Sequence, residues 1–180
     1  MIYVAFLRGI NVGGRKVIKM TELARIFTST GLKNVRTYIA SGNVIFESGS
    51  ANRTALTKKI EKALRENLGY EVTVVLRTLS ELEDIVARNP FKQRPGGDGF
   101  MQCVVFLAAE PQSKVQIPLI STKENLEVFE VTDQTAFILS GRKKNGSFGF
   151  PNNFVEKEFG IAGTTRNWST VNKILQAAEK

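Results

Sequence analysis

The sequence contains no histidine and one cysteine, and each shortage excludes a class of chemistry. Without histidine there is no His-based catalytic triad, no His-ligated metal and no imidazole acid–base relay. Cys103 cannot form an internal disulfide, and its place in the apolar run CVVFLA predicts a core residue of a protein in a reducing compartment. No ligand spacing typical of a metal site occurs, so we expect no metal and no cofactor.

Long hydrophobic runs are also missing. No stretch approaches the length of a membrane-spanning helix. The apolar run of residues 2–7 has no preceding basic region and is too short for the core of a signal peptide. We therefore expect a cytoplasmic protein that does not bind a membrane.

Acidic residues are fewer than basic ones: 17 Asp and Glu stand against 25 Lys and Arg, a net charge of +8. An excess of this sign raises the local concentration of anionic partners, so an anionic small molecule or nucleic acid is the expected partner. The same charge is also consistent with a role in solubility alone. Hydrophobic residues make up 42% of the chain, which predicts a folded core.

The first part of the chain has the pattern strand, helix, strand, strand, helix, strand. The runs IYVAFL, VRTYI and NVIFE and the alternation of residues 72–76 predict the strands. Apolar residues at helical spacing predict one helix that stops at Gly31 and another, capped by Ser50 or Asn52, that stops at Gly69. This order is the ferredoxin-like βαββαβ unit, of the α+β class with an antiparallel sheet.

A further helix is predicted after residue 78, with a capping box at Ser80 and Glu83. The segment PFKQRPGGDGF, residues 90–100, is rich in proline and glycine and is the predicted linker. It separates a ferredoxin-like half with a trailing helix, residues 1–89, from a second ferredoxin-like half with a C-terminal helix, residues 101–180.

The second half repeats part of the pattern of the first. LRTLSELEDIVARN aligns with TRNWSTVNKILQAA, so that Arg77 matches Arg166 and Leu79 matches Trp168. Together with the recurring strands, this match predicts an internal duplication of the ferredoxin-like unit. The alignment also predicts that Trp168 packs in a core.

The segments LRGINVGG, VRTYIASGNVIF, NPF and TTRNWSTV, which span residues 7 to 172, resemble the signature segments of a bacterial family known only as a domain of unknown function, DUF1697. The resemblance implies a duplicated ferredoxin-like architecture. It implies no activity and no catalytic residues.

Connectivity predicts where the polar groups of the first half meet. In the ferredoxin-like topology the loop after Leu7, the hairpin around ASGN and the segment at Gly69 and Tyr70 lie at one edge of the sheet. We therefore expect a ligand-binding site there. Its candidate residues are Arg8, Asn11, Gly13, Gly14, Lys16, Ser41 and Asn43. In TTRNW, Arg166 and Asn167 are candidates for recognition, although the sequence does not say whether they reach the same site.

The glycine-rich loop allows two interpretations. It keeps the G-x-x-x-x-G spacing of a P-loop from Gly9 to Gly14, but Arg15 and Lys16 stand where lysine and a hydroxyl residue belong. No hydroxyl is available for magnesium, so we exclude a nucleotide triphosphatase. Either the loop binds an anion through its backbone N–H groups and Arg8, or its glycines only permit positive φ angles.

A contact with nucleic acid has weaker indications elsewhere. The basic loop GRKKNGSFGF carries Phe148 and Phe150 but is also typical of a solvated loop. RNA-recognition domains share the βαββαβ order, yet their base-stacking aromatics are represented here only by Phe46, Tyr3 and Phe6, whose facing the sequence does not fix.

Three functions stay open on the sequence. A non-catalytic binder of a phosphate-bearing ligand or nucleic acid is preferred. The second is an enzyme acting on an anionic small molecule, with Arg8 and Lys16 as electrostatic stabilisers and Tyr38 or Tyr70 as proton donor. The third is a module for a protein partner or for dimerisation. The ligand, any reaction and the oligomeric state are not fixed by the sequence.

Overall fold

The computed structural model describes residues 1–94 and 96–179 and has an α+β fold with five helices and two antiparallel sheets in these residues. The chain divides into two compact units. Unit 1 comprises Met1–Glu83 and the C-terminal end from Ile174, and unit 2 comprises Asp84–Lys173. The predicted linker, residues 90–100, includes Pro95, which lies outside the described residues. No helix in the described part of the chain is long and apolar enough to cross a membrane.

Unit 1 is built on a four-stranded antiparallel sheet whose strand order is β2-β3-β1-β4. Its strands are β1 (Ile2–Leu7), β2 (Lys33–Tyr38), β3 (Asn43–Glu47) and β4 (Val74–Thr78). The central position of β1 explains its continuous apolar sequence, because a strand between two others and covered on both faces exposes almost no side chain.

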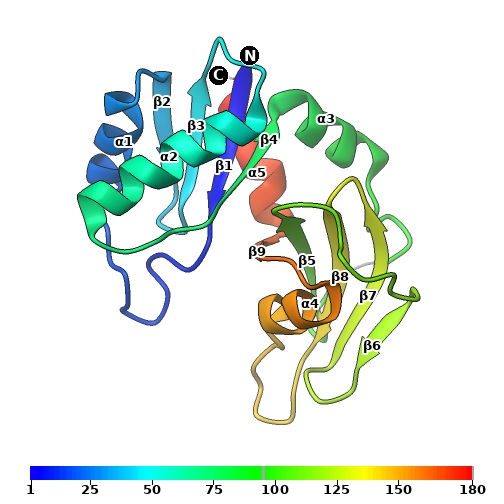
Figure 1. Cartoon of the computed structure of the whole chain (residues 1–180). Helices are drawn as coiled ribbons and strands as arrows, with labels where there is room; N and C mark the ends of the chain where they lie inside the picture. The colour runs from blue at the N-terminus through cyan, green and yellow to red at the C-terminus, as the bar shows by residue number, and fades with distance from the viewer. Residues whose placement is uncertain (95, 180) are drawn as a thin grey trace. The chain divides into compact units, whose positions relative to one another are not determined.

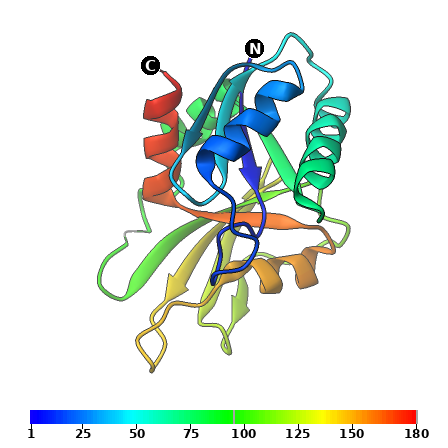
Figure 2. The same cartoon turned by 90° about the vertical axis from the view of Figure 1, so that its left-hand side faces the viewer.

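Two helices, α1 (Met20–Ser29) and α2 (Arg53–Leu68), lie side by side on one face of this sheet (Figures 1 and 2). The buried side chains of these helices are Leu23, Ile26, Phe27, Leu56, Ile60 and Leu64, and they pack on the inward residues of β1 and β3. Asn52 caps α2 by accepting a hydrogen bond from the N–H of Ala55 at 3.0 Å. Gly69 ends α2 with φ 77°, as predicted.

The helix α3 (Leu79–Arg88) follows β4 without a loop. The predicted capping box at Ser80 and Glu83 is wrong, because the helix starts earlier and Thr78 takes the capping position. Glu81 Oε2 accepts from the N–H of Thr78 at 2.7 Å, while Thr78 Oγ1 accepts from the N–H of Glu81 at 3.2 Å. Burial raises the pKa of Glu81, but hydrogen bonds from Arg53 and Thr78 outweigh it and leave that pKa below its usual value.

Unit 2 has a five-stranded antiparallel sheet in the order β6-β7-β8-β5-β9. Its strands are β5 (Phe100–Leu107), β6 (Leu119–Ser121), β7 (Leu126–Thr132), β8 (Thr135–Gly141) and β9 (Gly163–Asn167). One face is covered by α4 (Pro151–Phe159), whose Val155 and Phe159 pack on the core of the sheet. The helix α5 (Trp168–Ala178) follows β9 directly.

Unit 2 departs from the predicted repeat between β5 and β7. In its described residues this connection contains the short strand β6 and no helix, whereas unit 1 has α1 at the corresponding place. Pro111 and Pro118 lie in the connection, and proline removes a backbone donor and clashes with the preceding helical turn. The complete βαββαβ order therefore does not recur.

The thiol of Cys103 is confirmed as a core group, fully buried in unit 2. Burial raises the pKa of this thiol from 9.0 to about 12. Since the folded state holds the thiol proton more tightly than the unfolded chain, stability should fall as the pH rises from 9 towards 12. We expect a shallower decline in Cys103→Ala, measured by urea unfolding across this range. Equal slopes for the two proteins would contradict the assignment.

Candidate functional site

Residues 8–19, between β1 and α1, form a projecting hairpin that we call the finger (Figure 1). Its tip is an antiparallel bridge between Val12 and Arg15, and the N–H of Arg15 donates to the carbonyl of Val12 at 3.1 Å. Gly13 and Gly14 occupy the turn with φ 58° and 72°. A two-residue turn of this kind needs positive φ at both central positions, so the turn itself accounts for both predicted glycines.

Asn11 fixes the finger to the rest of unit 1. Its Nδ2 donates to the carbonyl of Ile18 at 3.1 Å and to that of Ala40 at 2.8 Å, and its Oδ1 accepts from the N–H of Ile18 at 2.8 Å. Ala40 belongs to the hairpin between β2 and β3, so this single side chain joins two of the segments that the topology predicts to be neighbours.

The segment after α2 is the third neighbour. The N–H of Arg8 donates to the carbonyl of Thr73 at 2.9 Å, and Lys16 Nζ donates to the carbonyl of Glu71 at 3.3 Å. The same ammonium lies 5.1 Å from the ring centroid of Tyr70, a cation–π distance. The finger, the β2–β3 hairpin and residues 70–73 are therefore in contact.

Ser41 and Asn43 serve the turn between β2 and β3. Asn43 is fully buried, and its Nδ2 donates to the carbonyl of Tyr38 at 3.0 Å and to Ser41 Oγ at 2.9 Å. These bonds hold the hairpin in place. Both side chains therefore have a structural role in the turn.

Ile39 carries backbone strain beside the finger. The strand β2 ends at Tyr38, one residue earlier than predicted, and Ile39 takes φ 50° with 49% of its surface exposed. A β-branched residue in the left-handed region costs about 1–2 kcal/mol. Backbone strain of this kind clusters at binding sites. Here the strained residue, Ile39, immediately precedes Ala40, the hydrogen-bond partner of Asn11.

A basic groove adjoins the base of the finger. A hollow of about 240 Å³ is lined by Lys58, Lys62 and Arg65 of α2 together with Glu61 and residues 71–73. Residues 71–73 also accept the hydrogen bonds from Arg8 and Lys16. We call the finger and this groove together the basic edge.

The carboxylates of the basic edge are already engaged. Glu61 Oε1 accepts from the N–H of Val74 at 2.9 Å, and Glu71 forms an ion pair with Arg65 at 3.8 Å. The finger itself has Arg8, Arg15, Lys16 and Lys19 and no acidic residue. In the groove Arg65 is thus paired with Glu71, and Lys62 is paired with Glu66, also at 3.8 Å. The edge is positive overall because the four cations of the finger add to the three cations and two carboxylates of the groove.

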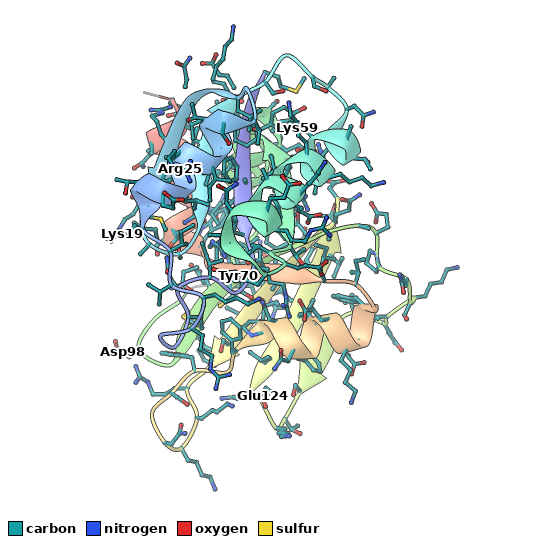
Figure 3. The ribbon with its side chains drawn as sticks, turned by 60° about the vertical axis from the view of Figure 1, so that its left-hand side comes forward. Lys19, Arg25, Lys59, Tyr70, Asp98 and Glu124 are labelled. Atoms are coloured by element: carbon teal, nitrogen blue, oxygen red, sulfur yellow. The ribbon has the colours of Figure 1, made fainter. Side chains whose placement is uncertain are left out.

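Tyr70 contributes a hydroxyl whose hydrogen bonding is incomplete. Its oxygen is buried and has no hydrogen-bond partner within the described residues. Figure 3 shows Tyr70 and Lys19 towards one end of unit 1, with Lys59 towards the other. A buried hydroxyl without a partner is rare, and an ordered water or a ligand oxygen would satisfy it.

Arg166 and Asn167, the other predicted site residues, lie on β9 of unit 2, whereas the residues of the basic edge belong to unit 1. Arg166 is buried, and its Nη1 donates to Thr164 Oγ1 and to the carbonyl of Thr165, both at 2.8 Å. Burial lowers the pKa of Arg166 to about 10, which leaves it charged at neutral pH. Asn167 is exposed.

Arg77 repeats this arrangement in unit 1. It is buried on β4, opposite Val4, as Arg166 lies opposite Val104, and its Nη1 also donates to the preceding carbonyl, that of Leu76, at 2.8 Å. The matched arginines are therefore buried strand residues in both units. Trp168 is half-buried against Phe91, with ring centroids 5.2 Å apart, in agreement with its predicted packing role.

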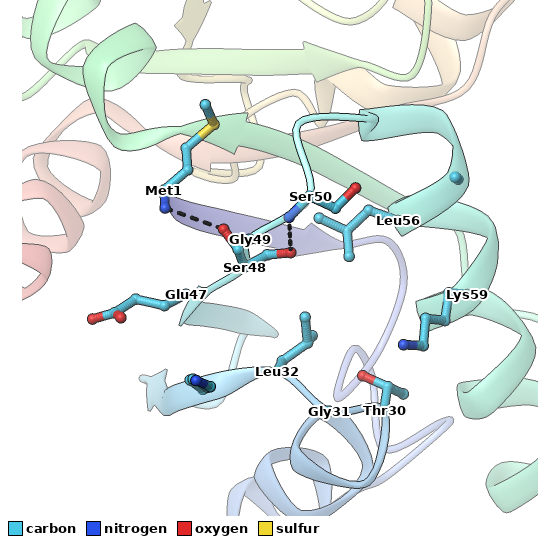
Figure 4. A pocket seen from close by; sticks show the side chains of 12 residues that line it. Met1, Thr30, Gly31, Leu32, Glu47, Ser48, Gly49, Ser50, Leu56 and Lys59 are labelled. Atoms are coloured by element: carbon cyan, nitrogen blue, oxygen red, sulfur yellow. Dashed lines mark hydrogen bonds between the residues drawn. The ribbon is translucent and has the colours of Figure 1, made fainter.

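A second hollow of unit 1 was not predicted from the sequence. It has a volume of about 500 Å³, and the side chains of Leu32 and Leu56 point into it (Figure 4). Lys33, Lys59 and the N-terminal ammonium, which donates to the carbonyl of Ser48 at 3.1 Å, supply cations, and Glu47 supplies an acid. Its segments lie far apart in the sequence, so no local pattern marks it.

No group of three or more potential metal ligands is gathered among residues 1–94 and 96–179. The basic edge combines cations with the two carboxylates of Glu61 and Glu71 and the buried hydroxyl of Tyr70.

The chain is similar to known proteins in fold and in sequence. The structure matches that of the conserved bacterial protein SP0830 from Streptococcus pneumoniae with a TM-score of 0.66 and 23% identity, over 99% of this chain and 98% of that chain. At this identity the match shows a shared fold. No curated protein matches the chain. The family model described as "Protein of unknown function (DUF1697)" matches residues 1–137, and the chain therefore belongs to that family.

Proposed function

We propose that the protein binds a phosphate-bearing anionic ligand at the basic edge of unit 1. The observation that carries this proposal is the junction between finger and groove. The bonds from Lys16 to Glu71 and from Arg8 to Thr73 join the acid-free finger to the cations of α2. The finger and the groove therefore form one continuous surface.

Physical chemistry supports phosphate as the recognised group. Arginine offers a planar fork that matches phosphate oxygens, and lysine offers a compact charge. The edge is an exposed projecting hairpin beside a shallow groove, a shape that suits the backbone of a nucleic-acid strand. Val12 and Val17 of the finger are 58% and 72% exposed, so apolar contacts with a ligand are available between the cations.

A short single-stranded RNA is the probe we choose. Its affinity, measured by fluorescence anisotropy, should fall linearly with salt on a logarithmic scale, because binding releases counterions. The double variant Arg15→Ala/Lys19→Ala should reduce the magnitude of this slope by about 1.4, since each lost phosphate contact removes about 0.7 for a single strand. Neither substitution removes a hydrogen bond described for the finger.

The matched control is Lys33→Ala/Lys59→Ala, which removes the same charge from the hollow at the other end of unit 1. Its slope should stay close to that of the unaltered protein. Equal losses in both variants would show that net charge alone attracts RNA, and this would overturn the proposed site. A sugar phosphate added in excess should raise the melting temperature if a small ligand occupies the edge instead.

We also propose that the two units are diverged copies of one ferredoxin-like unit. Both have a sheet in which the first strand lies between the last two strands of the unit, and both join the last strand to a helix without a loop. The registers Val4–Arg77 and Val104–Arg166 support the same pairing of strands. An experimental structure in which β1, β3, β4 and α3 superpose on β5, β8, β9 and α5 would test it.

A further inference from the structure

Unit 2 holds an exposed aromatic side chain on a constrained backbone. Phe150, just before the first residue of α4, is 57% exposed. An exposed phenylalanine forgoes the hydrophobic stabilisation of a buried one, but single cases are common on protein surfaces. What distinguishes Phe150 is its surroundings.

The backbone on both sides of Phe150 is fixed. Gly149 packs so closely on Glu124 that a Cβ at position 149 would collide with the carbonyl oxygen of Glu124. Its own carbonyl accepts a hydrogen bond from the buried Ser140 Oγ at 2.8 Å. Pro151, which follows, is buried and has a restricted φ. The backbone that carries the ring is therefore held in place before any ligand arrives, which lowers the entropy cost of binding.

Phe150 borders a hollow of about 370 Å³, within the usual range of small-molecule sites. Phe154 lies four residues further on and also lines the hollow, while packing on the core of unit 2. The other lining residues come from α4, from the end of β6 and from the connection between β6 and β7: Ser121, Lys123, Glu124, Asn153, Lys157 and Glu158.

The polar lining suits an anion attached to a ring. Lys123 and Lys157 are cations, and Asn153 offers both a donor and an acceptor. Of the two carboxylates, Glu124 is bound by Lys143 at 2.6 Å, and this hydrogen bond lowers its pKa. Glu158 is a further acceptor, suited to an exocyclic amino group.

We propose that this hollow binds an anion of the nucleoside monophosphate class, which carries a planar aromatic base and a phosphate. The base stacks on Phe150, Lys123 and Lys157 contact the phosphate, and Asn153 and Glu158 hydrogen-bond the edge of the base. All these residues belong to unit 2, so the proposal does not depend on the basic edge of unit 1.

The test is a titration of the full chain with adenosine monophosphate, followed by isothermal calorimetry and by amide NMR shifts. Adenosine monophosphate should bind more tightly than adenosine or ribose 5-phosphate, because only it uses both the ring and the cations. Phe150→Ala should weaken its binding about tenfold to a hundredfold, the usual effect of losing a base-stacking ring. Lys123→Ala/Lys157→Ala should weaken binding of the monophosphate but not of adenosine.

Phe100→Ala is the matched control. Phe100 is also a phenylalanine of unit 2 and is 52% exposed, yet it does not line the hollow. Its variant should bind adenosine monophosphate as the unaltered protein does. Three results would overturn the proposal: no binding, equal loss in both phenylalanine variants, or equal affinity for ribose 5-phosphate. Binding of hexanoate that is weakened equally by Phe150→Ala would also overturn the proposal, because the hollow would then be a site for any amphiphilic anion.

Discussion

Replacing Phe46 with alanine is expected to lower the free energy of unfolding by about 3–5 kcal/mol, the usual cost of truncating a buried aromatic residue. Phe46 is fully buried on β3. Its ring centroid lies 5.7 Å from that of Tyr3, in a stacked arrangement, and 5.7 Å from that of Phe27 on α1. Alanine would leave a cavity between sheet and helix that neighbouring rings cannot fill. Chemical denaturation measures the loss.

This result bears on function because Phe46, Tyr3 and Phe6 are the aromatics that a comparison with RNA-recognition domains would assign to base stacking. All three are buried in the structure. A loss of RNA binding in Phe46→Ala should therefore follow unfolding, and binding should be normal wherever the variant is still folded. Phe100→Ala, at an exposed ring, should change stability by less than about 0.5 kcal/mol. A stable Phe46→Ala protein with weakened RNA binding would contradict this account.

The elements of unit 1 were predictable because its local signals agree with its tertiary packing. The period of the apolar residues, the cap at Asn52 and the stop at Gly69 all indicate α2, and the structure has that helix. Connectivity then brought the finger, the β2–β3 hairpin and the segment at Tyr70 together, since a βαββαβ chain leaves few choices for its loops. The capping box was misplaced because Thr78 and Glu81 match the same pattern as Ser80 and Glu83, two residues away.

Side-chain roles at the site were much less predictable. Asn11 resembles a ligand-binding residue in sequence, but its amide anchors the finger to Ala40 and Ile18. Such a role depends on which carbonyls lie opposite the amide, and no sequence pattern contains that information. Arg166 likewise resembles a recognition residue in sequence, but the structure has it buried on β9.

Unit 2 shows a second limit. Its hollow joins Lys123 to Phe150, and the basic loop that contains Phe150 had indicated a nucleic-acid contact only through its composition. The rigid support from Ser140 and Gly149 is a matter of packing between segments, visible only in three dimensions.

Gly42→Ala is expected to destabilise the protein by about 2–5 kcal/mol, the sum of two separate costs. Gly42 has φ 77° in the β2–β3 hairpin, and a side chain in the left-handed region costs about 1–2 kcal/mol. A Cβ there would also lie 2.7 Å from Ile10 Cδ1 and 3.0 Å from Leu7 Cβ, and overpacking of this kind costs about 1–3 kcal/mol. Because Ile10 belongs to the finger, relief of the clash should move the finger and weaken RNA binding as well.

Gly31→Ala separates the two costs. Gly31 has φ 83°, but an added Cβ would have no atom within 4 Å, so this variant should lose only about 1–2 kcal/mol and should keep its RNA affinity. The difference between the variants in urea unfolding then measures the steric contact between hairpin and finger. If Gly42→Ala were no worse than Gly31→Ala, the hairpin would not be packed on Ile10. The support of the finger would then come from the hydrogen bonds of Arg8, Asn11 and Lys16.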